Sequence, residues 1–465
     1  MRSVIWNKSR RSLVWPGGVR RRTVNWEDLG VSHRLPPTLT QRLTALRDRP
    51  IEPTEKGFGA GDGPWDGTAT AARIAAVQPP LHAAGFTYPL LTLHEDALRN
   101  NVEAMAAFCA AAGVELAPHG KTAMSPELAA LQLSHGAWGI TVAAIGQLRT
   151  YRAFGFPRLL LANELVDEAG IAWLAAELAA DPGFEAYCYV DSLDGVSILD
   201  RVLTGHPAGR PLPVLVEIGH AAGRTGCRTD EAALAVAKAA AAAGTLTVAG
   251  AAGYEGGIRG ATQAETLGLV GSFCRRLRAL ADALAGWPAG GDRAPIVTAG
   301  GSVYFDVVAA ELTAGDGGVT AILRSGAYLT HDHGHYHEVS PATRGVAGAP
   351  ELRPAIELWA QVLSRPEPGL ALLSAGRRDV GFDAGLPVPL RGVRRDGGRL
   401  DVAGATVTEL NDQHAYLRLP EGAALAPGDL VGLGISHPCT TLDKWRMIPV
   451  VNRYDRVVDV VHAFF

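Results

Sequence analysis

A lysine and a glycine-rich turn each follow an apolar, strand-like run in this chain. Lys121 ends the run at residues 114–121 (VELAPHGK), which breaks at Pro-His-Gly and presents an amine. A second apolar run ends at residues 298–302 (TAGGS). A lysine amine can form a Schiff base, and a Gly-Gly-Ser turn offers backbone N–H groups to a phosphate. Together these features predict a pyridoxal phosphate site.

A second pair of reactive side chains, His437 and Cys439, lies near the C-terminal end of the sequence. In an extended segment, residues two apart point to the same side, so both could converge on one ion. Imidazole and thiolate suit Zn²⁺, and water or substrate would complete an open catalytic shell. From the spacing alone, we favour a buried cysteine and a hydrogen-bonded histidine in a β turn. The histidine-rich residues 331–337 are expected to form a polar loop at the mouth of the pocket rather than a tight metal site.

Eight short β-type runs alternate with alanine-rich stretches between about residues 114 and 326. The stretches between them, such as residues 230–243 and 263–285, have helical periodicity. Eight β-then-α units over roughly 200–250 residues predict a (βα)8 TIM-like barrel, with a doubly wound open sheet as the alternative. The strand candidates are residues 114–117, 139–143, 158–161, 186–190, 214–218, 246–253, 296–298 and 320–323.

In such a barrel, functional side chains stand at the C-terminal ends of the strands. Reading those ends in order gives a lysine, an arginine in a glycine-rich loop, a tyrosine in GYEGG, the Gly-Gly-Ser turn and the segment RSGAY. Each feature alone is common, but their joint placement favours a cofactor site. The predicted cofactor-binding residues are Lys121, Arg224, Tyr254, Gly300, Gly301, Ser302 and Tyr328, and Lys121 is also the predicted catalytic residue.

Composition and turn chemistry suggest three parts for the 465-residue chain. Residues 1–85 are predicted to be a partly basic N-terminal extension and a candidate for flexibility, residues 86–345 the barrel, and residues 346–465 an antiparallel β domain with the metal pair. Hydrophobic residues make up 47% of the chain, enough to bury a sizeable core. A net charge of −4 does not suggest a nucleic acid or an anionic membrane as partner.

Five unevenly spaced cysteines argue against a disulfide framework and for a reducing cytoplasm. The first 22 residues carry seven Lys/Arg and no acid, but they lack the apolar stretch of a secretory signal. They could form a disordered leader or an arm that folds onto the body, and Trp6, Trp15 and Trp26 favour docking of part of it.

Five motifs, PHGKT, GYEG, TAGGS, RSGAY and HPCTTLDKW, resemble the D-serine dehydratase and D-threonine aldolase group of alanine racemase-like (fold type III) pyridoxal phosphate enzymes. The resemblance covers roughly residues 85–460. It implies that Lys121 carries the cofactor, that His437 and Cys439 bind zinc, and that the protein is a homodimer. His414 resembles a histidine near the metal in this group. The aldolase branch tends to carry an acidic residue where Cys439 stands, which favours a dehydratase.

The predicted function is therefore a zinc- and pyridoxal phosphate-dependent lyase that converts D-serine or a related D-3-hydroxyamino acid to a 2-oxo acid and ammonia. Lys121 would accept the Cα proton, and zinc on His437 and Cys439 would polarise the β-hydroxyl. The alternatives are a D-threonine-type aldolase and a cofactor-binding protein without this activity. A binding protein needs no open metal site, so the His437–Cys439 pair argues against the last.

Overall fold

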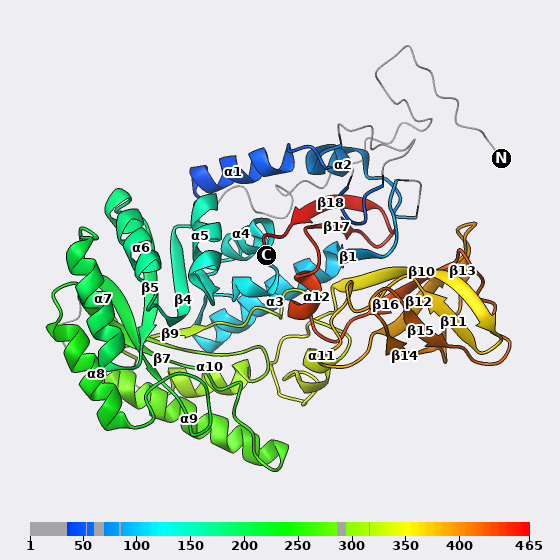
Figure 1. The fold of residues 1–465 in the computed structure, drawn as a ribbon. Coiled ribbons are helices and arrows are strands. Elements are labelled where there is room, and N and C mark those ends of the chain that lie inside the picture. Colours follow the sequence, from blue (N-terminus) through cyan, green and yellow to red (C-terminus); the bar gives the residue numbers. More distant parts are fainter. Residues whose placement is uncertain (1–34, 53, 60–68, 83–84, 286–293, 316) are drawn as a thin grey trace.

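The computed structural model describes residues 35–465, apart from residues 53, 60–68, 83–84, 286–293 and 316. Two sheets lie side by side, with the barrel at the left of Figure 1 and a second sheet at the right. The basic arm with Trp6, Trp15 and Trp26 lies outside the described residues. None of the described helices is long and apolar enough to cross a membrane.

The first sheet contains all eight predicted strands in parallel, in the order β2-β9-β8-β7-β6-β5-β4-β3. Its ends meet, because the Trp138 N–H donates to the Leu116 carbonyl at 2.7 Å and His119 pairs in parallel with Thr141. The sheet is therefore a barrel and not the open alternative. Its strands are β2 (Glu115–Leu116), β3 (Ile140–Val142), β4 (Arg158–Glu164), β5 (Glu185–Val190), β6 (Leu212–Ile218), β7 (Leu246–Gly253), β8 (Ile296–Ala299) and β9 (Thr320–Leu323).

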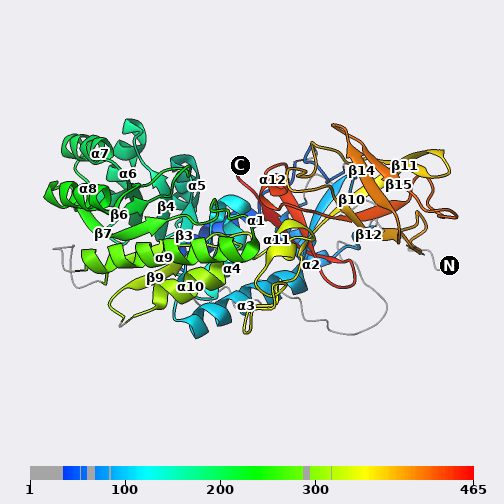
Figure 2. The ribbon, with the colours of Figure 1, turned by 90° about the horizontal axis from the view of Figure 1, so that it is seen from below.

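Helices cover the outside of this barrel, as Figure 2 shows for α6 to α9. Several begin at a side-chain cap, since Ser125, Asp167, Ser192, Thr229 and Thr262 each accept an N–H from the first turn. The helices are α3 (Glu95–Ala112), the 3₁₀ turn η1 (Gly120–Thr122), α4 (Pro126–Ser134), α5 (Ile145–Phe154), α6 (Glu168–Ala180), α7 (Leu193–Gly205), α8 (Asp230–Ala242), α9 (Gln263–Leu284) and α10 (Phe305–Thr313).

The second sheet is mostly antiparallel, as the β runs after residue 346 predicted. It also takes in β1 (Leu90–His94), which pairs antiparallel with β10 and parallel with β17. The predicted barrel segment 86–345 thus contains one strand of the other sheet. The remaining strands are β10 (Ile356–Glu367), β11 (Leu370–Leu373), β12 (Val388–Val393), β13 (Arg399–Leu400), β14 (Thr406–Leu410), β15 (Ala415–Arg418), β16 (Leu430–Gly434), β17 (Met447–Val451) and β18 (Val457–His462).

Short helices outside the barrel connect the two sheets. Helix α1 (Pro37–Arg47) lies against α5, and its Arg47 forms a 2.6 Å ion pair with Asp459 of β18. Helix α2 (Ala71–Val77) packs on β18, and α11 (His335–Val339) follows the last barrel strand. Helix α12 (Cys439–Leu442) lies against η1. The second sheet therefore brings its C-terminal segment to the loop that carries the predicted catalytic lysine.

Candidate active site

A cavity of about 210 Å³ opens at the C-terminal ends of the barrel strands. Its wall contains residues that follow β2, β6, β7, β8 and β9, together with the first residue of α12. Six of the seven predicted cofactor residues and one of the two predicted metal ligands line it. These are Lys121, Arg224, Tyr254, Gly300, Gly301, Ser302 and Cys439.

Lys121 projects into this cavity from the tight turn η1. The turn is held by Tyr151, whose hydroxyl donates to the Gly120 carbonyl at 2.9 Å. A Cβ on Gly120 would lie 2.6 Å from that hydroxyl, so only glycine fits before the lysine. The amine remains accessible through the cavity, while the surrounding protein atoms desolvate it and lower its pKa. Cys439 opposes this shift, and Arg224 and Arg324 add to it. A lowered pKa increases the fraction of neutral, nucleophilic amine.

Arg224 and Tyr254 form one side of the cavity. The Arg224 guanidinium lies over the Tyr254 ring, 4.1 Å from its centroid, which is a cation–π contact. No carboxylate within the described residues lies at ion-pair distance from Arg224. Its charge is therefore available to a bound anion.

The TAGGS turn differs from its predicted role. Gly300 has a φ of 114°, which explains the need for glycine there. However, the N–H groups of Gly300 and Gly301 donate to the buried Glu255 carboxylate at 3.0 and 2.7 Å, so they are not free for a phosphate. The Ser302 hydroxyl accepts the Ala327 N–H at 3.2 Å, and both residues line the cavity. The Ser302 hydroxyl keeps its own O–H to donate, so it is the group on this wall that suits a phosphate.

Tyr328, a predicted cofactor residue, lies outside the cavity wall, and its buried hydroxyl has no hydrogen-bond partner among the described residues. Its side chain is 1% exposed and packs in the hydrophobic core. Burial raises the pKa of its phenol far above the usual value, and neighbouring Cys109 of α3 adds to the shift. The chain turns at Gly326 and Ala327, which sends the next side chain inward beneath α3.

Arg324 and His119 line the cavity, although the sequence did not single them out as site residues. The Arg324 guanidinium is 4% exposed and donates to the Thr298 hydroxyl at 2.7 Å and to the Gly253 carbonyl at 2.6 Å. Desolvation, followed by the charges of Lys121 and Arg324, holds the pKa of His119 well below its usual range, so its ring is neutral. The position of Arg324 at the end of a predicted strand was the one feature of the sequence that could have identified it as a site residue.

Two buried polar atoms in this wall, His119 Nδ1 and the Tyr189 hydroxyl, have no hydrogen-bond partner among the described residues. Buried polar groups normally have a partner, so these atoms await a ligand. An amine, a fixed guanidinium, a hydroxyl and two unsatisfied polar atoms fit pyridoxal phosphate, which offers an aldehyde, a ring nitrogen, a phenolic oxygen and a phosphate.

His437 and Cys439 do come together, at the edge of the cavity. A hydrogen bond with Cys439 is the largest cause that raises the pKa of His437 to about 9, and Asp383 adds to it. The segment is not extended as expected, because Pro438 has helical φ and ψ and Cys439 begins α12. The Cys439 Sγ also lies 3.4 Å from the Thr122 hydroxyl, next to Lys121.

Asp383 fixes the orientation of this histidine, and nothing in the sequence marked it. Its Oδ2 lies 2.7 Å from His437 Nδ1, and its Oδ1 accepts the Thr440 hydroxyl at 2.7 Å. A carboxylate on one ring nitrogen leaves the other for a metal, as in many metal-bound histidines. Within the described residues, no third His, Cys, Asp or Glu joins His437 and Cys439 in a potential metal cluster. The protein would supply two ligands.

The histidine-rich segment contributes a tyrosine to the cavity. Tyr336 lines it, with its ring centroid 6.1 Å from that of His437. The buried Asp332 accepts the N–H groups of Gly334 and Tyr336, which shapes the loop. Burial lowers the pKa of both His331 and His333 to about 4. His414, by contrast, is exposed in the turn between β14 and β15.

Comparison with known proteins gives a consistent assignment. Residues 93–303 match the alanine racemase, N-terminal domain, and residues 355–451 match the "Putative serine dehydratase domain". A 3-hydroxy-D-aspartate aldolase of Paracoccus denitrificans is 29% identical over 360 residues, which covers 75% of this chain and 87% of the relative.

Two solved structures share the fold. D-threonine aldolase from Filomicrobium marinum superimposes with a TM-score of 0.68 at 24% identity, covering 81% of this chain and 95% of that one. D-threo-3-hydroxyaspartate dehydratase from Delftia sp. HT23 gives 0.64 at 22% identity, covering 83% and 99%. Both domain models are matched in order, so the chain carries an alanine racemase-like N-terminal domain followed by a serine dehydratase-like domain, and it is similar to the D-serine dehydratase and D-threonine aldolase group of fold type III pyridoxal phosphate enzymes.

Proposed function

We propose that this protein is a pyridoxal phosphate-dependent lyase of D-3-hydroxyamino acids. It would eliminate the β-hydroxyl as water, and hydrolysis of the resulting enamine would consume one water and release ammonia and a 2-oxo acid. The observation that carries the proposal is one cavity lined by both Lys121 and Cys439, with His437 in contact with Cys439. An amine for the cofactor and a soft metal ligand thus face the same cavity. The relatives support this class, since they are aldolases and dehydratases of hydroxylated D-amino acids.

Four residues would hold the cofactor. Lys121 would bond to its aldehyde carbon, Ser302 and Ala327 would face the phosphate, and Arg324 would face the ring. When bound, the cofactor supplies an electron sink for the pair released at Cα. Arg324 suits this position because its guanidinium is held by two hydrogen bonds to the barrel and cannot lose its proton.

Lys121 is the base in this proposal. With a substrate amine in its place, the free Lys121 amine would take the Cα proton. Its lowered pKa favours the unprotonated form that this step needs. Arg224 has no ion-pair partner in the described part of the chain and would bind the substrate carboxylate, which fixes Cα next to the amine.

His437 and Cys439 would hold Zn²⁺, which supplies Lewis-acid activation of the β-hydroxyl as a leaving group. The donor set of one imidazole and one thiol suits this ion better than it suits Mg²⁺. In support, a cysteine-to-alanine variant of D-threo-3-hydroxyaspartate dehydratase has been solved in a metal-free form.

A retro-aldol cleavage is the second candidate, and the identity to 3-hydroxy-D-aspartate aldolase favours it. It would use the same residues, but the hydroxyl would lose its proton and the Cα–Cβ bond would break. The thiol at Cys439 favours elimination, because the aldolase branch of the group that this chain resembles tends to carry an acidic residue at that position.

D-Threonine distinguishes the two reactions. Elimination gives 2-oxobutanoate and ammonia, whereas retro-aldol cleavage gives glycine and acetaldehyde. Chelation of the metal, or Cys439→Ala, should abolish product formation while the bound cofactor keeps its visible absorbance. Glycine and acetaldehyde as the only products would reject the dehydratase, and full elimination activity in metal-free protein would reject the role of zinc. We also propose a homodimer, on the family resemblance, which sedimentation equilibrium would test.

A further inference from the structure

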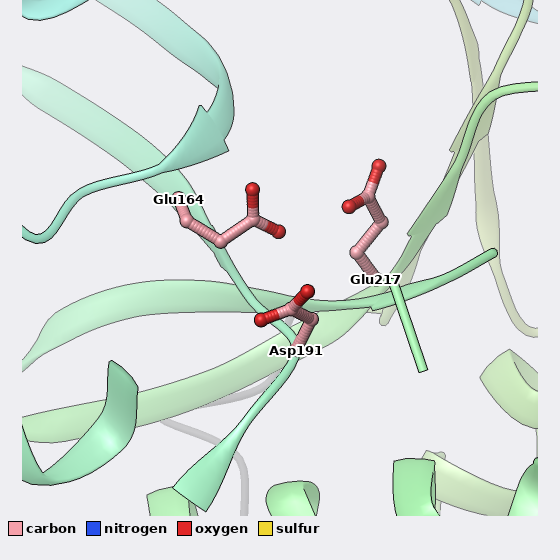
Figure 3. Close-up of side chains that lie close together, drawn as sticks. All are labelled: Glu164, Asp191 and Glu217. Carbon is pink, nitrogen blue, oxygen red and sulfur yellow. The ribbon is translucent and has the colours of Figure 1, made fainter. Parts of the chain in front are cut away.

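Three carboxylates meet at the ends of adjacent barrel strands, away from the proposed zinc ligands. Glu164 ends β4, Asp191 directly follows β5, and Glu217 lies near the end of β6. One oxygen from each lies within 4.8 Å of the others, and Figure 3 shows the side chains turned toward a common centre. Because β6 is diametrically opposite β2 in the ring of eight, this acidic cluster faces the wall that carries Lys121.

The protein leaves these oxygens unsatisfied. Both carboxylate oxygens of Glu164 and one of Glu217 are buried without a hydrogen-bond partner, and Glu217 is only 5% exposed. The Tyr189 hydroxyl, which lines the cavity with Glu217, is also buried and without a partner. Asp191 is held in place by the Gly226 N–H, which donates to its Oδ2 at 2.9 Å. Unsatisfied buried oxygens on this scale call for a bound species.

No positive side chain balances the cluster. Within the described residues, none of the three carboxylates forms an ion pair with Lys, Arg or His. Burial raises the pKa of Glu164 to about 9, and repulsion from Glu217 and a hydrogen bond between the two carboxyls, which requires a shared proton, add to it. The group therefore needs either a proton or a cation, and a cation can satisfy all three carboxylates at once.

We propose that Glu164, Asp191 and Glu217 bind a hard divalent cation such as Mn²⁺, Mg²⁺ or Ca²⁺ beside the active site. Such ions take carboxylate oxygens at about 2.0–2.6 Å, so two ligands of one ion lie at most about 4–5 Å apart. The oxygens of the cluster meet this limit. An all-oxygen set selects a hard ion, in contrast to the imidazole and thiol of His437 and Cys439.

The site would also set the charge of the cavity. Glu217 and Arg224 line the same space, and an unneutralised cluster would compete with the substrate carboxylate for the arginine. A divalent ion removes most of that negative charge and leaves Arg224 free. The ion would thus support substrate binding without touching the reacting atoms.

Manganese binding, followed by electron paramagnetic resonance, tests the proposal. The holoenzyme carrying Cys439→Ala serves as the background, so that the proposed zinc site does not contribute. We expect one Mn²⁺ per chain, and at least a tenfold increase in Kd on adding Glu164→Gln or Asp191→Asn. Glu168→Gln is the matched control, because Glu168 is an exposed carboxylate that pairs with Arg201 on the surface.

Two results would overturn the inference. One is a Kd above about 1 mM in the Cys439→Ala holoenzyme, weaker than about −4 kcal/mol of binding. The other is equal affinity in Glu164→Gln, Asp191→Asn and the Glu168→Gln control. Either would mean that the carboxylates share protons instead. Thermal unfolding followed by circular dichroism verifies that each variant is folded, and the two independent substitutions protect the test from a local defect in one.

Discussion

Replacing Asp383 with asparagine should weaken zinc binding without removing either proposed ligand. The Asp383 carboxylate lies 2.7 Å from Nδ1 of His437 and is itself held by the Thr440 hydroxyl. It therefore selects the ring orientation and tautomer in which Nε2 is free for a metal. Asparagine preserves the size of the side chain but removes the charge that stabilises this arrangement.

The structure sets the size of the effect. Loss of a carboxylate behind a metal-bound histidine costs about 10–100-fold in metal affinity. The Asp383 side chain is 51% exposed, so solvent screens its charge and the lower end of that range applies. We expect about a tenfold increase in Kd, equivalent to about 1.4 kcal/mol.

Competition with a chromophoric chelator measures this Kd directly. Asp412→Asn is the control, because Asp412 pairs with Arg378 on the surface at 3.3 Å. If Asp383 acts only by positioning His437, excess zinc should restore most of kcat to Asp383→Asn. A Kd within twofold of the wild-type value would refute the reasoning, as would a loss of kcat that persists at saturating zinc.

Four further substitutions concern the cofactor and the fold. Lys121→Ala should lose both the visible absorbance of the bound cofactor and the activity, whereas a coloured variant would contradict covalent attachment. Ser302→Ala should weaken cofactor binding about tenfold or more, because a hydrogen bond to a charged group contributes about 1.5–3 kcal/mol. Gly301→Ala should have less effect on cofactor binding. The added Cβ would make only ordinary contacts, at 3.5 Å, and the Gly301 N–H already donates to Glu255. Glu357→Gln should cost about 3 kcal/mol at pH 7. Burial alone would raise the Glu357 pKa, but hydrogen bonds and charge interactions with Arg391 and His94 outweigh it and lower that pKa from 4.5 to about 2. Since that pKa is depressed on folding, the stabilisation is present above pH 4.5 and lost as the pH falls toward 2.

Fluorescence titration with pyridoxal phosphate measures the cofactor Kd of the Ser302 and Gly301 variants. Equal Kd values in the two would contradict a phosphate site at Ser302. Urea unfolding between pH 7 and 2 measures the contribution of Glu357. The difference in unfolding free energy between the wild-type protein and Glu357→Gln should shrink across that range, and a constant difference would contradict the assignment.

The barrel and the contents of its cavity were accessible from the sequence for a physical reason. Parallel strands must be buried on both faces, so each leaves an apolar run that ends at a polar loop. Loops from the same end of a barrel share one cavity. The strand ends alone therefore predict that Lys121, Arg224, Tyr254 and Ser302 lie together, and all four line the cavity.

Contacts that depend on long-range packing could not be predicted in this way. The donation of the Gly300 and Gly301 N–H groups to Glu255 depends on how two loops meet, and sequence spacing does not encode it. The inward turn of Tyr328 depends on the space beneath α3. Asp383 lies 54 residues from its histidine in an irregular segment without any local signal.

The pairing of β1 with the second sheet explains why one cavity can combine the barrel residue Lys121 with Cys439, which follows a strand of the second sheet. Because β1 leads directly into α3, and α3 leads through β2 to η1, the barrel begins from a strand that β10 and β17 hold in place. The same sheet returns the chain as α12, where Cys439 Sγ lies 3.4 Å from the Thr122 hydroxyl, and as the C-terminal end, where the Phe464 N–H donates to the Met124 carbonyl. The loop that follows Lys121 is therefore held by two contacts from segments that extend from the second sheet. A displacement of about 1 Å between reacting groups can cost about a hundredfold in rate, so these contacts bear on catalysis as well as on stability.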